Sequence, residues 1–567
     1  MTELKPNAEQ NTPQANGVNP SSQIASTIDA SRNPNKRLEK QTSALENIAL
    51  HLGIAKCNSD HVDNRMFFTT LIVLVLVFLA SVAGFFTMWF TTVYDDRLLE
   101  QLKLTQHSPA ADWWEKPPVN PLLKVHVFNY TNVEDFFDKK TNKLKVVDLG
   151  PYVYTETAEK VNVVYNGDGT ITYKEKRSYQ FLANQSSGMQ YDEIVVPNVP
   201  MLTAASKYYD RSFFQKTILK TALAGVSAKP FKKLKLNSFL WGYQDELLNL
   251  ASKLSFDSEV SFEKFGILMT RNGTSPETFT IYTGENDLKQ LLVIKELDGK
   301  PALDMWSTDE CNRVDGTDGS QFPPHLMDKR QTLYVFIKSL CRKFPLRYEK
   351  EVTLFDGIPA WRYKAPLDVF AHPSINVDNQ CFCHLDSASC PKSGVLNATL
   401  CSYEAPIFAS FPHFYTGDRE LLETVEGLNP QQDKHETFAD IHPRLAFPID
   451  GASRFQINVQ VKKTISDLEP FDDDHILPVI WIEVVPGHIS EELRELIYYS
   501  SFGVNNLQFW LKYGSLLICA TTFALLAMTC YFRGRKQSNG QLEKGEQQQQ
   551  YPQEQNMKLN AMNNIAP

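Results

Sequence analysis

Two long apolar stretches bracket a chain that otherwise mixes polar and apolar positions. The first, Phe67 to Phe90, holds 24 residues without a charge, and the second runs from Tyr513 to Phe532. A helix of roughly 20 residues crosses the hydrocarbon core of a bilayer. The pattern therefore predicts transmembrane helices over 66–92 and 511–532, and the first is predicted to be an uncleaved signal anchor.

Charges beside these stretches set the predicted orientation. Arg65 precedes the first stretch and Arg533 follows the second, whereas Asp95 comes after the first. Because cytosolic flanks carry the excess of Lys and Arg, both termini are predicted to face the cytosol. The polar tails over 1–65 and 533–567 are predicted to be disordered or largely so.

Between the helices, residues 93–510 form one predicted extracytosolic domain. Apolar residues alternate with polar ones over Leu123–Asn129 and Arg454–Lys463, which is the period of a strand with one core face and one wet face. Asn166-Gly167-Asp168-Gly169 predicts a hairpin turn within 163–181. These patterns predict an α+β fold built on a barrel-like or strongly curved antiparallel sheet.

The segment 200–254 follows a different period. Apolar residues recur there every three or four positions, which predicts a helical insert of two or three helices with little strand character. Apolar ridges beside a lysine cluster suit anionic, amphipathic ligands. A solvated face over an ordinary core is the alternative. The candidate docking residues are Phe213, Phe214, Lys216, Lys220, Lys229, Lys232 and Lys233.

Composition narrows the class of protein. The chain has 567 residues, of which 43% are apolar and 22% charged, and these proportions are typical of a folded globular domain. The formal net charge of -9 argues against a nucleic-acid partner.

Six of the nine cysteines lie in the predicted extracytosolic domain, where an even number in an oxidising compartment predicts disulfides. Six cysteines allow fifteen connectivities, and spacing does not choose among them. A zinc site at Cys381-Phe382-Cys383-His384 is the disfavoured alternative, because thiolate zinc sites belong mainly to reducing compartments. The six are Cys311, Cys341, Cys381, Cys383, Cys390 and Cys401.

Two kinds of modification fit this topology. Cys57 and Cys530 lie near the predicted membrane boundaries and are candidates for palmitoylation, against the alternative of unmodified thiols. Four glycosylation sequons fall between the two apolar stretches, as lumenal acceptors require. Their asparagines are Asn129, Asn184, Asn272 and Asn397.

The sequence carries no familiar catalytic pattern. It has no Gly-x-Ser-x-Gly elbow, no His-Glu-x-x-His helix and no phosphate-binding glycine loop, so we expect no enzyme, cofactor or metal. A receptor or transporter for extracytosolic ligands and a two-span ligand-gated channel are the two remaining classes. The channel is disfavoured, because the stretch Tyr513–Phe532 contains no acidic or basic residue.

An ordered series of short motifs resembles the class B scavenger receptors from the first apolar stretch to the second. The motifs are Asn120-Pro121, Gly150-Pro151-Tyr152-Val153-Tyr154, Pro197-Asn198-Val199-Pro200, Leu240-Trp241-Gly242-Tyr243, Gly316-Thr317-Asp318, Phe322-Pro323-Pro324, Cys381-Phe382-Cys383, Pro412-His413-Phe414, Gly427-Leu428-Asn429-Pro430 and Asp440-Ile441-His442-Pro443.

The resemblance implies a β-barrel core, an apical helical bundle and an internal hydrophobic tunnel for lipid. It also implies disulfides between Cys311 and Cys381, between Cys341 and Cys401, and between Cys383 and Cys390. In some members a lysine pair sits near the tunnel mouth, but this chain has no lysines at the matching positions.

The implied function is a cell-surface receptor that binds lipids (fatty acids, sterols or phospholipids), lipoproteins or anionic particles and passes lipid to the membrane. The expected location is the plasma membrane, because no acidic dileucine signal occurs between Arg533 and Pro567. A lysosomal membrane protein that exports lipid or carries enzyme cargo is the alternative. A homo-oligomer is left open.

Overall fold

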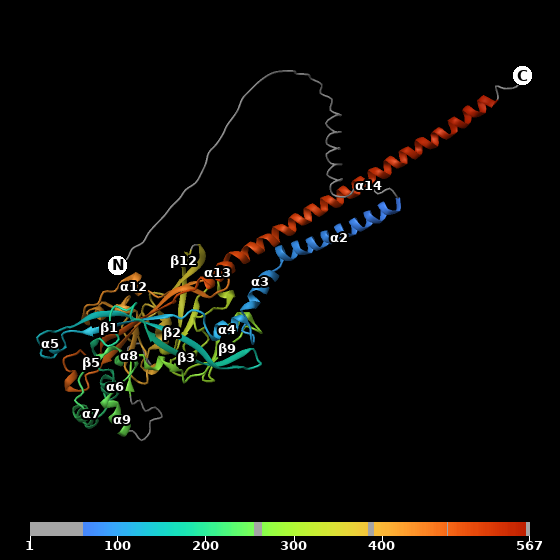
Figure 1. Cartoon of the computed structure of the whole chain (residues 1–567). Helices are drawn as coiled ribbons and strands as arrows, with labels where there is room; N and C mark the ends of the chain where they lie inside the picture. The colour runs from blue at the N-terminus through green and yellow to red at the C-terminus, as the bar shows by residue number, and fades with distance from the viewer. Residues whose placement is uncertain (1–59, 255–263, 356, 384–389, 473, 563–567) are drawn as a thin grey trace, which may run out of the picture. The chain divides into compact units, whose positions relative to one another are not determined.

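The computed structural model describes residues 60–254, 264–355, 357–383, 390–472 and 474–562 (Figure 1). The chain divides into two units. The larger is Ser81–Ile518, and the described part of the smaller consists of the outer segments of two long helices, α2 (Asp60–Phe90) and α14 (Val504–Met562).

Both predicted membrane spans lie in helices. Asn64–Phe90 and Glu491–Leu542 are the two helical stretches in the described chain that are long and apolar enough to cross a membrane. Within the smaller unit the rings of Phe78 and Phe523 lie 6.1 Å apart, so α2 and α14 contact each other there.

The helix α14 corrects the disorder predicted for 533–567. It continues to Met562, well beyond the predicted end of the second span at residue 532. Gln, Glu, Lys and Met make up about half of residues 533–562 and favour a helix, although Gly534, Gly540, Gly545 and Pro552 oppose it. The prediction weighed low hydrophobicity and overlooked helix propensity.

A large, mostly antiparallel sheet organises the larger unit. It has 15 strands, and its main path runs in the order β10-β9-β3-β2-β1-β19-β18-β17-β13-β12-β11. The predicted hairpin at Asn166–Gly169 joins β2 to β3, and both strands predicted by alternation are present. In chain order the path strands are β1 (Leu122–Tyr130), β2 (Leu144–Tyr165), β3 (Thr170–Phe181), β9 (Phe279–Tyr282), β10 (Ile294–Leu297), β11 (Leu333–Ile337), β12 (Arg342–Leu354), β13 (Ile358–Lys364), β17 (Phe438–Ile441), β18 (Pro448–Val461) and β19 (His475–Val485).

A short segment joins the two edges of this path. The amide of Ile294, in β10, donates to the carbonyl of Gly316 (2.9 Å). Thr317 donates to Tyr334 (3.0 Å) and accepts from Phe336 (2.8 Å), both in β11. Gly316 and Thr317, which we call the closing segment, therefore link β10 to β11 by hydrogen bonds, and we call the resulting ring of strands the barrel. The predicted α+β class with an antiparallel sheet is confirmed.

The concave side of the sheet is apolar. The rings of Phe344 (β12) and Phe455 (β18) lie 5.1 Å apart although two strands separate them in the sheet order, so they meet across the interior. Leu123 faces Tyr154 on one neighbouring strand and Val484 on the other, and pleating places all three on this inner side.

The convex side of β18 corrects the prediction of one wet face. Gln456 and Asn458 are both 0% exposed. Asn458 Nδ2 donates to the Phe408 carbonyl (3.1 Å) and to Ser410 Oγ (3.0 Å), and Gln456 Oε1 accepts from the His413 amide (2.6 Å). Buried polar side chains are tolerated when they are hydrogen-bonded, so alternation alone does not separate a wet face from a covered one.

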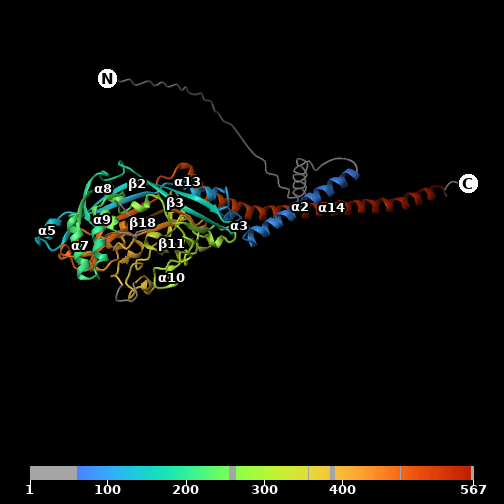
Figure 2. The same cartoon turned by 90° about the horizontal axis from the view of Figure 1, so that it is seen from below.

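Within the larger unit, α3 (Val93–Leu99) and α13 (Glu491–Tyr498) lie at one end and the helical insert lies at the other (Figure 2). Arg444 ties the first end together, because its guanidinium pairs with Asp95 and donates to Asn505 Oδ1 (2.8 Å). Tyr94 Oη donates to the Val504 carbonyl (2.8 Å) beside it. These contacts join α3 to the start of α14.

The closing segment gives a direct test of the barrel. A Cβ on residue 316 would lie 2.9 Å from the backbone nitrogen of Phe336, closer than real Cβ contacts allow. We predict that Gly316→Ala lowers the free energy of unfolding by about 2 kcal/mol, measured by denaturant unfolding. Gly225→Ala is the matched control, because a Cβ at residue 225 meets nothing within 4 Å. Equal stabilities for the two variants would contradict the assigned closure.

Candidate functional site

The helical insert contains four helices, where the sequence predicted two or three, and two short strands, β5 (Phe231–Lys235) and β6 (Tyr243–Gln244). The strand β5 corrects the prediction of little strand character, and it pairs with β4 (Glu193–Pro197) just before the insert. Phe231 is buried, and three of the other residues of this strand are lysines. Lysine is uncommon in strands, so the sequence pattern did not predict β5. The helices are α6 (Val199–Lys207), α7 (Phe213–Gly225), α8 (Leu236–Trp241) and α9 (Glu246–Leu254).

Helix α7 begins with a capping box. Ser212 Oγ accepts from the Gln215 amide (3.4 Å), and Gln215 Oε1 accepts from the Ser212 amide (3.2 Å). Leu219 and Leu223, one turn apart, are the buried side chains of this helix. The cap and these two leucines fix which face of α7 points outward.

The outward face of α7 is apolar where a soluble helix is polar. Phe213 is 86% exposed, Phe214 is 72% exposed and Ile218 is 50% exposed. Phe214 and Ile218 are four residues apart, so they lie on the same face. A group of exposed large apolar side chains on one short helix indicates a contact surface.

The candidate lysines separate into two groups. Lys220 and Lys229 are exposed and Lys216 lies over the ring of Tyr209 at 5.5 Å. Lys216 and Lys220 belong to α7 and are therefore close to its apolar face, whereas Lys229 follows the helix. Lys232 pairs with the buried Asp245 at 2.5 Å and Lys233 pairs with Glu193 at 2.6 Å. We therefore assign Lys232 to support of the insert, while the other lysines remain candidates for docking.

A charged cluster lies on the inner side of the β2–β3 hairpin. Lys160 lies 3.0 Å from Glu175 and 3.4 Å from Asp318, and Arg177 contacts Glu175 (2.7 Å) and Glu156 (3.3 Å). Strand pleating puts Glu156 and Lys160 on the same side as Tyr154, which faces the interior.

Burial would raise the pKa of Glu175, but the two cations more than offset this and lower the pKa to about 2. The cluster is thus ionised inside the barrel. Sequence patterns missed it, because charges occupy both faces of the hairpin and predict two wet faces.

Beyond this cluster the inner side is apolar and partly accessible. Phe455, Ile457 and Val484 point inward but are only half-buried. Ile457 and Val484 pack against the main core cluster, which includes Leu123 and Ile480, whereas Phe455 packs against a second cluster that includes Phe344. The long tunnel implied by the family resemblance remains a prediction.

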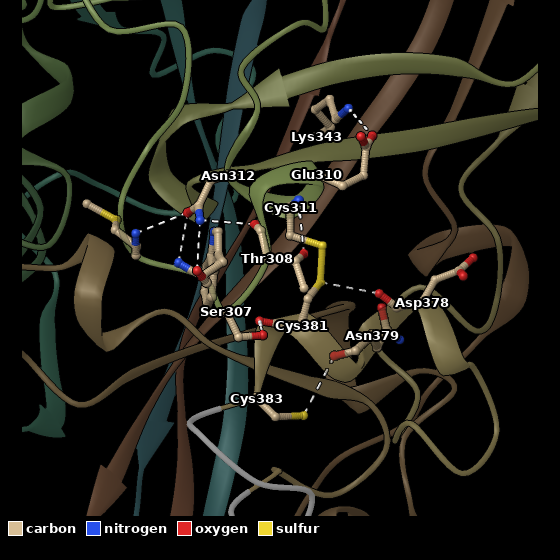
Figure 3. Close-up of a disulfide and its surroundings, with 12 residues drawn as sticks. Ser307, Thr308, Glu310, Cys311, Asn312, Lys343, Asp378, Asn379, Cys381 and Cys383 are labelled. Carbon is tan, nitrogen blue, oxygen red and sulfur yellow. Dashed lines mark hydrogen bonds and ion pairs between the residues drawn. A yellow bond between two sulfur atoms is a disulfide. The ribbon is translucent and has the colours of Figure 1, made fainter.

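Three disulfides join the loops beside β12. Cys311 is bonded to Cys381, Cys341 to Cys401 and Cys383 to Cys390, the same pairs that the resemblance implies. Polar contacts surround the first of these (Figure 3): Ser307 Oγ donates to the Cys381 carbonyl (3.1 Å), and Asn312 Nδ2 donates to the Trp306 carbonyl (2.7 Å). Oxidation of Cys381 and Cys383 removes the thiolates that the zinc alternative requires.

The remaining predicted modification sites differ in accessibility. Asn184 and Asn272 are exposed, whereas Asn129 and Asn397 are half-buried. Asn129 Oδ1 also accepts from the Val195 amide (2.8 Å). Cys530 is exposed on α14, and Cys57 lies outside the described residues.

The structure also brings together a buried histidine cluster that the sequence did not predict. The carboxylate of Asp148 accepts from His413 Nε2 (3.0 Å) and Trp481 Nε1 (3.1 Å), and His126 Nδ1 lies 3.4 Å away. His413 stacks on His435, with ring centroids 4.7 Å apart. Asp148 lies 265 positions from His413 and 333 positions from Trp481, so no local pattern predicts the cluster.

The features above define a membrane protein with two long apolar helices and a large α+β domain on a closed, mostly antiparallel sheet. The model of the CD36 family matches residues 71–530, and the chain belongs to this family.

The relatives include two kinds of membrane protein. Lysosome membrane protein 2 of Homo sapiens is 34% identical over 429 residues, which cover 75% of this chain and 87% of the relative. Scavenger receptor class B member 1 of Sus scrofa is 31% identical over 426 residues, covering 74% and 81%. Lysosome membrane protein 2 of Rattus norvegicus is 35% identical over 437 residues, covering 76% and 89%.

The histidine cluster predicts a loss of stability in acid. Burial, with the charges of His413, Arg454 and Lys434 against that of Asp148, lowers the pKa of His435 to about 3. In the unfolded chain His435 is protonated below about pH 6.5, whereas in the folded chain it stays neutral down to about pH 3. The free energy of unfolding therefore falls as the pH is lowered from 6.5 to 3. We predict that His435→Gln reduces the loss between pH 7 and 5 by about 1 to 2 kcal/mol.

The measurement is thermal unfolding of the purified protein at each pH. His488→Gln is the control, because His488 is exposed and lies outside this cluster. The explanation fails if His435→Gln and the unmodified protein lose the same stability on acidification.

Proposed function

We propose that this protein is a receptor that binds lipids or lipid-bearing anionic particles at the helical insert and passes lipid through the barrel interior to the membrane. The main observation behind this proposal is the exposed apolar face of α7, where Phe213 is 86% exposed and Phe214 is 72% exposed. Lys216 and Lys220 lie on the same helix. Aromatic side chains enter the apolar part of a lipid surface while lysines attract its anionic groups.

The apolar interior of the barrel offers a bound lipid a path to the membrane that avoids water. Each methylene of a lipid that enters water from apolar surroundings costs about 0.8 kcal/mol. The inward Phe455, Ile457 and Val484, half-buried on adjacent strands, support a path that keeps an acyl chain or sterol out of water. Such transfer needs no catalytic group.

The proposed membrane arrangement follows from the two helices. In it, α2 and the apolar part of α14 each span the bilayer, both termini are cytosolic and the insert lies at the membrane-distal end. Basic Arg533, Arg535 and Lys536 after the second apolar stretch support this orientation. The exposed Asn184 and Asn272 would then be glycosylated outside the cytosol.

Two locations are consistent with the family. Scavenger receptor class B member 1 supports a cell-surface receptor, which we favour because the C-terminal segment contains no acidic dileucine. Lysosome membrane protein 2 supports the second candidate, a lysosomal membrane protein that exports lipid or carries cargo. Both candidates use the same insert, so a test of docking serves both.

The docking surface is tested by the double substitution Phe213→Ser with Phe214→Ser. We predict that it weakens binding to vesicles containing phosphatidylserine by 10-fold or more, because burial of one Phe side chain contributes about 2 kcal/mol. Full-length protein in nanodiscs, captured on a sensor, measures the binding. Folding should be unaffected, since both side chains are exposed.

Val377→Ser is the matched control, because Val377 is 75% exposed and lies outside the insert. It should leave vesicle binding unchanged. If the double variant binds vesicles as tightly as the control does, α7 is not the docking surface and the proposed function loses its support.

A further inference from the structure

Arg342 is a buried cation that no described carboxylate neutralises. It is the first residue of β12 and is 5% exposed. Within the described residues its side chain takes part in no ion pair, and its Nε is buried without a hydrogen-bond partner. The guanidinium carbon lies 3.8 Å from the centroid of the Phe382 ring, which covers one face and supplies no countercharge.

The next residue shows that acidic partners are available nearby. Lys343 points to the opposite side of β12 and contacts Glu310 (3.1 Å) and Asp315 (2.7 Å). Two carboxylates thus neutralise the less buried cation, while the more buried one has none. An unpaired charge away from water is unfavourable, and the burial of Arg342 lowers its pKa to about 9.

A small cavity lies beside this guanidinium. Its volume is about 20 Å³, and one water needs about 10 to 15 Å³. A monatomic ion or a single carboxylate group fits this space. Apolar lining is provided by Val369, Phe370, Phe382, Val395 and Leu396.

Besides Arg342, the polar side chains of the lining are His372 and Asn379. His372 lines the cavity, and its Nδ1 accepts from the Ser374 amide (3.2 Å), which leaves the hydrogen on Nε2. Asn379 Nδ2 donates to the Ala371 carbonyl (2.7 Å) and holds the cavity wall in place. No acidic side chain is among the lining residues that the structure describes. This composition favours an anion and opposes a cation.

We propose that the cavity beside Arg342 binds one small monovalent anion, either a halide such as chloride or a short carboxylate. The anion accepts hydrogen bonds from the guanidinium of Arg342, and His372 is the second donor. By neutralising Arg342 it stabilises the start of β12, next to the disulfide of Cys341. The site is separate from the helical insert and does not depend on the proposed function.

The test is thermal unfolding of the full-length protein in detergent, in which gluconate is replaced by chloride, bromide or acetate at constant ionic strength. A bound anion raises the unfolding temperature, and the rise saturates; we expect about 2 to 4 °C at ten times the Kd. Gluconate is the bulky reference anion, because its carboxylate carries a five-carbon polyhydroxyl chain that acetate lacks. A halide response without an acetate response assigns the site to halides, and the reverse assigns it to carboxylates.

Arg342→Met should remove this response, because it removes the charge and keeps an unbranched apolar stem. Lys343→Met is the matched control and should retain the response, since Lys343 is neutralised by Glu310 and Asp315. An equal response in Arg342→Met and the unmodified protein, or no saturable response in the unmodified protein, would overturn the proposal.

A direct observation covers the case in which Arg342→Met does not fold. Crystals of the unmodified protein grown in bromide should give an anomalous difference peak beside the Arg342 guanidinium if the site takes halides. When the halide response saturates, a missing peak there means that the ion binds elsewhere, and the assignment to Arg342 is wrong.

Discussion

The hydrogen bonds that the closing segment makes to β10 and β11 are the constraint on which the rest of the fold depends. Without Gly316 and Thr317 the sheet would have two open edges, and its concave side would face water. Closure allows Phe344 and Phe455 to meet across the interior, and it places the charged cluster of Lys160 and Glu175 inside the same enclosure. An interior with an apolar wall and a neutralised polar region is suited to an amphipathic molecule.

The two ends of the larger unit have different roles: one holds the apolar helices and the other exposes an apolar surface. At one end Arg444 fastens α3 to the start of α14, so the chain entering and leaving the apolar helices is held by the barrel. At the other end α7 exposes Phe213 and Phe214 on a helix whose orientation is fixed by its cap and by Leu219 and Leu223. A rigid scaffold with an exposed apolar helix at its far end is consistent with capture of lipid surfaces by a member of this family.

Sequence patterns predicted many elements of this molecule because those elements are determined by residues that are neighbours in the chain. The charge-free stretch after Arg65 indicates a membrane span, Asn166–Gly169 indicates a hairpin, and the alternation in β18 indicates a strand although not what covers it. The motif series indicated the family and the α+β class. Features made by distant residues were invisible. The polar side of β18 is covered by residues 408–413, and the histidine cluster joins Asp148 to His413 and Trp481. The sequence likewise did not indicate that Arg342 is buried without a neighbouring carboxylate in the described chain, because residues distant in the chain surround it.

The most direct test of the account is native mass spectrometry of the full-length protein, released from detergent before and after exchange with fatty acids and cholesterol. The account predicts bound lipid that exchanges, and predicts that Ile457→Trp, which fills the interior, lowers lipid occupancy, while Val164→Trp on an exposed position (55% exposed) does not. Protein that stays free of lipid under every condition, or equal occupancy in the two variants, would contradict the claim that lipid passes through the barrel.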